Sequence, residues 1–215
     1  MIKILSFMIA LSLPSAAQAD YFLWQDSKSG LTVTFPDTWK QQTNMNPATI
    51  FTIEGPGNAD KPVCKINASS DKRYTIFPAE YGDAVQRVAV SRDFWQKYMG
   101  LYDEYTLNKI YDGAGLGRWN ASYARGTWSL RAGDVVQLRR GILFASLYYD
   151  TLYVVECSSL NHAYETWDYD FRSIIKSIDF RKMYHEKKTG DYEDFLRGAD
   201  KLFWAQTGPE GSIKY

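Results

Sequence analysis

The sequence predicts an α+β domain built around an antiparallel sheet. Runs of alternating apolar and polar residues, the pattern of half-buried strands, occur through most of the chain. Three of these runs follow one another over residues 118–157 with short connections, which is typical of an antiparallel meander. The clearest helix comes after them, with apolar residues at spacings of three and four. Strands followed by a packed helix indicate the α+β class.

Three strands are predicted in the first third of the chain, at residues 31–35, 50–54 and 63–68. Pro36 stops the first strand, and a turn that begins at Gly55 closes the second. In the third strand the alternation places Lys65 and Asn67 on one face and, on the other, Cys64, Ile66 and Ala68.

A helix is predicted over residues 82–99, and Gly100 is suited to end it. The apolar period is imperfect, so we expect a break near Ser91. The stripe that faces the core is expected to contain Val85, Val88, Ala89 and Trp95. The residues around Gly100 are expected to form an exposed loop that carries Tyr98, Tyr102 and Tyr105.

The second half of the chain is expected to hold strands over residues 118–128, 135–149 and 152–157. Ser159 or Asn161 is expected to cap the helix that follows. Its buried stripe is predicted to be Tyr164, Trp167, Phe171, Ile174, Ile175 and Ile178. The glycine-rich segment over residues 113–117 leads into a strand rather than a helix, so we interpret it as a flexible connection and not as a dinucleotide loop.

Residues 1–19 have the features of a secretory signal peptide, with Lys3 before an apolar run over residues 4–13. The sequence Ala17-Gln18-Ala19 predicts cleavage before Asp20. The alternative is a membrane anchor, but crossing a bilayer takes about twenty apolar residues. We therefore expect a periplasmic or secreted chain without an integral membrane span.

The mature chain is predicted to have one domain over residues 20–180 and an appendage over residues 181–215. The appendage is expected to be a charged linker and an amphipathic helix over residues 191–205. Docking of this helix on the domain is expected, because an unpaired stripe exposes a large apolar patch. Docking on a partner protein is the alternative.

The composition argues against several classes of protein. The chain has 25 basic and 25 acidic side chains, so it offers no electrostatic footprint for nucleic acid. Two Cys and two His are too few for a zinc finger or an iron–sulfur cluster, and we predict no metal site and no cofactor.

Catalytic motifs are also missing from the sequence, so we expect that the protein is not an enzyme. There is no G-x-S-x-G elbow, no H-E-x-x-H and no P-loop. Ser158 and Ser159 lie close to His162 in the sequence and could imitate a nucleophile and its base, but a capping role accounts for Ser159. His185 lies among lysines, which is typical of a solvated surface.

Two motifs near the ends of the predicted domain resemble a known family. The first is a strand with a Phe-Pro-x-x-Trp ending over residues 30–39, and the second is the end of the helix over residues 171–180. Across residues 22–180 the chain resembles the PsbP-like superfamily, which includes the extrinsic P subunit of the photosynthetic oxygen-evolving complex and a yeast Ran-binding import factor. The resemblance implies an α–β–α sandwich around a central antiparallel sheet. It also implies a binding or assembly role without shared catalytic residues.

Cys64 and Cys157 are predicted to form a disulfide. Each lies in a β-rich run and shares a face with apolar neighbours, and an exported chain reaches an oxidising compartment. The alternative is a pair of buried thiols that behave as small hydrophobic side chains.

Aromatic residues, 16% of the chain, provide the remaining functional signal. Aromatic and arginine side chains on one sheet face suit stacking and planar hydrogen bonding with a ligand. On this basis the candidate binding residues are Trp119, Tyr123, Arg125 and Trp128. The alternative is that these rings face the core while nearby arginines reach water.

Three hypotheses of function follow from these observations. The first is a non-enzymatic exported factor that binds a protein partner, unidentified, or helps to assemble an envelope complex. The second is a protein that binds a glycan or a small amphipathic molecule through the candidate residues on the strand of Trp119. The third is a hydrolase that uses His162.

Overall fold

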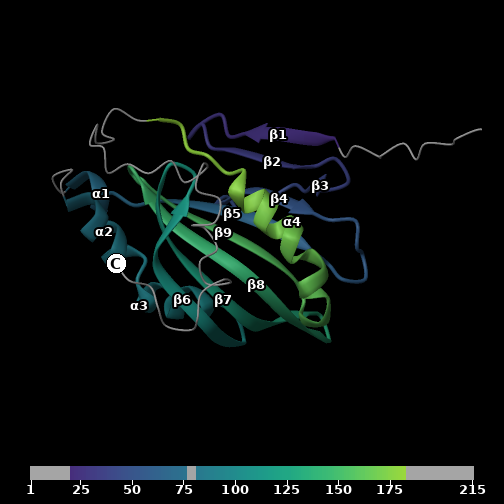
Figure 1. Ribbon diagram of the computed structural model, residues 1–215. Helices are drawn as coiled ribbons and strands as arrows, with labels where there is room; N and C mark the ends of the chain where they lie inside the picture. The colour runs from purple at the N-terminus through teal and green to yellow at the C-terminus, as the bar shows by residue number, and fades with distance from the viewer. Residues whose placement is uncertain (1–19, 77–80, 183–215) are drawn as a thin grey trace, which may run out of the picture.

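The structure is a computed structural model that describes residues 20–76 and 81–182 (Figure 1). The predicted signal peptide, residues 1–19, and the predicted helix over residues 191–205 lie outside the described residues. Both stay predictions, as does the boundary between domain and appendage at residue 180.

A seven-stranded antiparallel sheet forms the centre of the molecule, with the order β3-β4-β5-β9-β8-β7-β6. Its strands are β3 (Lys40–Gln41), β4 (Thr49–Glu54), β5 (Val63–Ser70), β6 (Glu104–Leu116), β7 (Trp119–Ala132), β8 (Val135–Tyr148) and β9 (Thr151–Leu160). Strands β7 to β9 form the meander that the sequence predicts, and β6, which was not predicted, extends it at the edge of the sheet. Strand β9 pairs with β5, so the early and late halves of the chain join between these two strands. A separate two-stranded ribbon consists of β1 (Tyr21–Gln25) and β2 (Thr32–Pro36).

Helices cover both faces of the sheet, which makes an α–β–α arrangement (Figure 1). They are α1 (Arg73–Ile76), α2 (Gly82–Ala89), α3 (Arg92–Met99) and α4 (Tyr164–Lys176), the last preceded by a 3₁₀ turn, η2 (Asn161–Ala163). On β7, Ser122 accepts a hydrogen bond from Trp95 of α3, at 2.7 Å, whereas Arg125 donates to Asp168 of α4, at 3.3 Å. Side chains alternate along a strand, so α3 and α4 lie on opposite faces. The α+β expectation is confirmed.

The core beneath α4 forms as the helical spacing predicts. Phe171 and Ile175 are fully buried, and the edge of the Trp39 ring meets Phe171 with the ring centroids 6.1 Å apart. The β1–β2 ribbon is tied to the end of α4, where Ser177 Oγ accepts a hydrogen bond from Thr34 N at 2.8 Å.

The predicted break near Ser91 is confirmed, because α2 ends at Ala89 and α3 begins at Arg92. The predicted core stripe is wrong at one position: Val88 is exposed, and Gln86 is buried instead. Gln86 can enter the core because its Oε1 accepts a hydrogen bond from Leu147 N, at 2.7 Å, which compensates for burying the amide.

Three other local expectations are corrected by the structure. The predicted loop with three tyrosines divides between helix and strand, because Tyr98 belongs to α3 and Tyr105 to β6. Most of the glycine-rich segment, residues 113–116, is the end of β6, where Ala114 pairs with Ala121, and only Gly117 lies in the turn to β7. Ser159 lies inside β9, and α4 begins without a side-chain cap.

Candidate functional site

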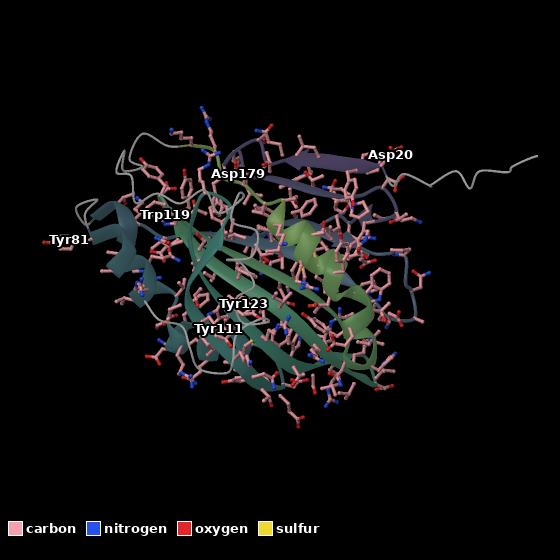
Figure 2. The ribbon with its side chains drawn as sticks, viewed as in Figure 1. Asp20, Tyr81, Tyr111, Trp119, Tyr123 and Asp179 are labelled. Atoms are coloured by element: carbon pink, nitrogen blue, oxygen red, sulfur yellow. A yellow bond between two sulfur atoms is a disulfide. The ribbon has the colours of Figure 1, made fainter. Side chains whose placement is uncertain are left out.

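The four candidate binding residues all lie on β7, but they do not share a face. Trp119, Tyr123 and Arg125 occupy alternate positions on the α4 side, and Trp128 points to the α3 side. All three rings are at most 5% exposed; Trp119 and Tyr123 are labelled in Figure 2. A role of these residues in binding stays a prediction, and only Trp128 lines a large cavity.

The α4 side of β7 holds a buried polar cluster around Asp168. Its carboxylate accepts hydrogen bonds from Tyr164 Oη at 2.9 Å and from Arg125 Nη2 at 3.3 Å, and Arg172 Nη2 lies 3.1 Å away. Tyr123 is buried beside this cluster, and burial raises the pKa of its phenol well above the ordinary range. The cluster joins α4 to the sheet, with the single carboxylate of Asp168 between two arginines.

The serines and the histidine that could imitate a hydrolase are not brought together. Ser158 is completely buried and accepts a hydrogen bond from Arg139 Nε at 3.2 Å. The His162 side chain is 74% exposed, and its Nε2 lies 3.9 Å from Asp60. Ser159 Oγ donates to the carbonyl of Leu160. The described residues around His162 therefore contain no arrangement of nucleophile and base.

A cavity of about 570 Å³ opens on the other face of the sheet. Its wall is the loop between β4 and β5, and its floor comes from the facing side chains of β5, β7, β8 and β9. The floor residues used below are Lys65, Tyr102, Trp128, Arg139, Glu156 and Ser158. This volume lies in the range of small-molecule sites, about 300–1,000 Å³.

Glu156 on β9 is the centre of a hydrogen-bonded network in the floor. Its carboxylate accepts hydrogen bonds from Tyr102 Oη at 2.7 Å and Tyr98 Oη at 3.1 Å, and its other oxygen lies 3.1 Å from Lys65 Nζ. Burial and the negative charge of Glu156 raise the pKa of both tyrosines far above their ordinary values. The phenols therefore stay protonated and act as donors, and the charge of Glu156 is matched by Lys65.

Arg139 on β8 lies beside this network but is bonded to neutral groups. Its Nε donates to Ser158 Oγ, and its Nη2 donates to the carbonyls of Lys61, at 2.7 Å, and Ser158, at 3.0 Å. In the described part of the chain no carboxylate lies within ion-pair distance of this guanidinium, and its Nη1 has no hydrogen-bond partner. Arg139 is only 6% exposed, and burial lowers its pKa, which the charge of Glu156 opposes.

The wall of the cavity is held in place from the far side of the sheet. Asp60 in the β4–β5 loop accepts a hydrogen bond from Trp167 Nε1 of α4 at 3.1 Å. A Cβ at Gly57 would lie 2.5 Å from the Trp167 ring, so only glycine fits this contact. Lys61 has a left-handed backbone, φ 49°, and presents its carbonyl to Arg139. A strained residue fixed by its surroundings is typical of a functional loop.

The aromatic part of the floor depends on a glycine. The ring of Trp128 lies 5.3 Å from that of Tyr102, and a Cβ at Gly141 would come within 2.5 Å of Trp128. The missing side chain on β8 therefore lets Trp128 lie against the sheet, where its ring helps to line the cavity.

The groups around the cavity suit recognition. The phenols of Tyr98 and Tyr102 donate hydrogen bonds, and the carboxylate of Glu156 is already bonded to both of them and to Lys65. The hydroxyl of Ser158 accepts a hydrogen bond from Arg139. Within residues 20–76 and 81–182 there is no group of three His, Cys, Asp or Glu side chains that could hold a metal ion. The helices of these ranges are all too short or too polar to cross a membrane.

Most of the residues around the cavity are not among the candidates that the sequence predicts. Arg139 is one of the arginines near the aromatic strand and not one of its predicted binding residues, and Tyr98 and Tyr102 were expected in an exposed loop. A usable signal did exist for Lys65 and Glu156. Each adjoins one of the two cysteines, and the pairing of Cys64 with Cys157 sets Lys65 opposite Glu156.

Comparison with known proteins gives similarity to solved structures only. No family model matches the chain. A search of curated proteins finds no match either.

The solved structures that resemble the chain share little sequence with it. Cyanobacterial PsbP from Synechocystis sp. PCC 6803 has 15% identity and a TM-score of 0.47, with 79% of this chain and 98% of that chain covered. LpqN of Mycobacterium tuberculosis, described as involved in cell envelope biogenesis, has 14% identity and a TM-score of 0.47, with 76% and 91% covered. A protein of unknown function from Pseudomonas aeruginosa, PA94, has 9% identity and a TM-score of 0.37, with 76% and 99% covered. These are similarities of overall fold, each at a TM-score below 0.5.

Proposed function

We propose that the protein is an exported, non-enzymatic binding protein whose recognition site is the cavity lined by Trp128, Arg139 and Glu156. The observation that carries the proposal is the buried guanidinium of Arg139, which has no carboxylate partner in the described chain. A buried charge is costly unless a partner compensates it. A ligand that enters the cavity would supply this partner.

Binding is favoured over catalysis by the state of the surrounding groups. Glu156 is occupied by three donors, and the raised pKa values of Tyr98 and Tyr102 keep both phenols protonated at neutral pH. Neither a free base nor an activated nucleophile is therefore offered to a molecule in the cavity. Export is supported by the Cys64–Cys157 disulfide, since disulfides persist in oxidising compartments.

Filling the mouth of the cavity is expected to abolish ligand retention. Leu130 lines the cavity and is 40% exposed, so Leu130→Trp adds bulk there without displacing a core residue. The chain from Asp20 onward would be incubated with a small-molecule extract of its native envelope, repurified and analysed by mass spectrometry. We expect one or a few compounds, chemically unchanged, on the wild-type protein and none on Leu130→Trp.

Leu138→Trp is the matched control, because Leu138 is similarly exposed on the opposite face of the same hairpin. It should retain the compounds at the wild-type level. Equal retention by wild type and Leu130→Trp would place binding outside the cavity, and conversion of a compound into a product would contradict a non-enzymatic role.

A second candidate function, contact with a partner protein, is favoured by a different observation. The end of the β7–β8 hairpin exposes large apolar side chains on both of its faces, namely Leu130, Val135, Val136 and Leu138. Exposed apolar groups that lie together are common at protein interfaces.

Val136→Glu is expected to remove such a contact. Cross-linking in the native envelope should give an adduct between the wild-type protein and its partner, and Val136→Glu should lose this adduct. Val88→Glu is the control, because it places the same charge at an exposed valine on α2, and it should keep the adduct. An adduct that survives Val136→Glu would rule out this surface.

A further inference from the structure

We propose that the cavity takes a monocarboxylate, with the carboxylate on Arg139 and an apolar body toward Val63 and Leu130. The inference rests on the proposed function, because it names the chemical class of ligand for the same site. Three observations lead to it: the balance of charge around the cavity, the hydrogen bonds that Arg139 already makes, and the apolar lining.

The charges around the cavity leave one cation uncompensated. Lys65 and Glu156 form an ion pair at 3.1 Å. At the rim, Glu54 and Lys61 carry opposite charges. Arg139 remains, without a carboxylate partner in the described chain. One surplus positive charge matches a ligand group with one negative charge, whereas a phosphate monoester, which approaches two negative charges at neutral pH, would need a second unmatched cation.

The hydrogen bonds of Arg139 determine how an anion would meet it. Nε and Nη2 are held by Ser158 and by the carbonyl of Lys61, so they fix the plane of the guanidinium. Nη1 is the nitrogen that has no partner in the described chain. A carboxylate oxygen that accepts from Nη1 would complete the hydrogen bonds of the guanidinium, and the fixed side chain would lose little freedom on binding.

The remaining lining requires the ligand to carry an apolar part. The cavity is bordered by Pro62, Val63 and Leu130, and by the rings of Tyr102 and Trp128. A volume of about 570 Å³ is far larger than a carboxylate group alone. Apolar surface buried there would contribute about 25 cal/mol for each Å² removed from water. A carboxylate on an apolar body uses both parts of the site.

Calorimetric titration with three compounds that share one ring system tests the inference. The probes are 2-naphthylacetate, its uncharged amide 2-naphthylacetamide, and 2-naphthylmethylphosphonate, added at pH 8 to the chain from Asp20 onward. We expect the carboxylate to bind about tenfold or more tightly than the amide, which corresponds to about 1.4 kcal/mol. The phosphonate should bind more weakly than the carboxylate.

Arg139→Gln is expected to remove the preference for carboxylate over amide. Arg131→Gln is the matched control and should keep the preference. Arg131 lies on the neighbouring strand, is exposed, and has as its ion-pair partner the exposed Asp103 at 3.8 Å. Since Arg139→Gln loses buried hydrogen bonds and could unfold the protein, Leu130→Glu gives a second test at an exposed position of the rim. It should weaken the carboxylate about tenfold more than the amide, because both lose the apolar contact and only the carboxylate meets a like charge, while Leu138→Glu changes neither.

Each outcome separates the two proposals. If a folded Arg139→Gln protein binds the carboxylate as the wild type does, the monocarboxylate inference is wrong. If amide and carboxylate bind wild type equally and Leu130→Trp blocks both, the cavity is a binding site but its charge selectivity is refuted. If no probe binds wild type at millimolar concentration, the inference is overturned, and the extract experiment alone then decides the proposed function.

Discussion

Removal of the Cys64–Cys157 disulfide is expected to lower the free energy of unfolding by about 4–5 kcal/mol. The bond joins residues 93 positions apart, and a cross-link that closes a loop of this size removes much of the conformational entropy of the unfolded chain. It lies where β5 pairs with β9, with the two Cα atoms 4.1 Å apart, so it links the early strands to the meander. A loss of this size is a large part of the 5–15 kcal/mol typical of a domain.

Urea unfolding of the oxidised and the reduced protein measures this effect. Reduction breaks only the cross-link and keeps both side chains, whereas Cys64→Ala combined with Cys157→Ala also removes two buried sulfur atoms. The double variant should therefore be less stable than the reduced wild type. Equal urea midpoints for the oxidised and reduced proteins would contradict the prediction.

The disulfide also bears on the candidate site. The register that pairs the cysteines sets Lys65 opposite Glu156 on the other face of the sheet. The disulfide and the Lys65–Glu156 ion pair are thus consecutive residue pairs between β5 and β9. We expect reduction to weaken ligand binding as well as folding.

The parts of the fold that the sequence predicts are those with one buried side. Residues 31–35 and the helix of Phe171 repeat with the period of their element, because one face of each is apolar. The strand β1 was missed because Tyr21, Phe22 and Leu23 are all exposed, so burial imposes no alternation on it. The strand β6 was missed because two bulges interrupt its register and shift its pattern.

The candidate site was less predictable, for two reasons. Trp119, Tyr123 and Trp128 were predicted to share a face because they lie on one strand. Side chains alternate along a strand, however, and Trp128 is an odd number of residues away from both Trp119 and Tyr123, so its ring points to the opposite face. The spacing in the sequence was enough to show this. The position of Arg139 depends on a different kind of information. Its partners are Ser158 and the carbonyl of Lys61, which come from the neighbouring strand and from a loop. No local pattern in the sequence brings these groups together.

Alkaline pH is expected to destabilise the protein steeply above pH 10. Burial raises the pKa of five tyrosines above the ordinary value of about 10, most strongly at Tyr98, Tyr102, Tyr123 and Tyr164 and less at Tyr153. In the unfolded chain these phenols lose their protons near pH 10, whereas in the folded protein they keep them to higher pH. The stabilisation is therefore complete below pH 10 and is lost as the pH rises toward the folded pKa values, by about 1.4 kcal/mol per pH unit for each tyrosine.

Tyr123→Phe isolates one of these contributions. Tyr123 Oη is buried without a hydrogen-bond partner in the described chain, so the substitution removes an ionisable group and breaks no hydrogen bond there. Urea unfolding at pH 8 should show stability equal to or above that of the wild type, because an unsatisfied buried hydroxyl is lost. Between pH 10 and 11 the stability should fall about 1 kcal/mol less than in the wild type, because the unfolded phenol is already half ionised at pH 10. Tyr169→Phe, at a residue 74% exposed, should leave the pH dependence unchanged. Identical slopes for Tyr123→Phe and wild type would show that Tyr123 ionises as freely in the folded protein as in the unfolded chain.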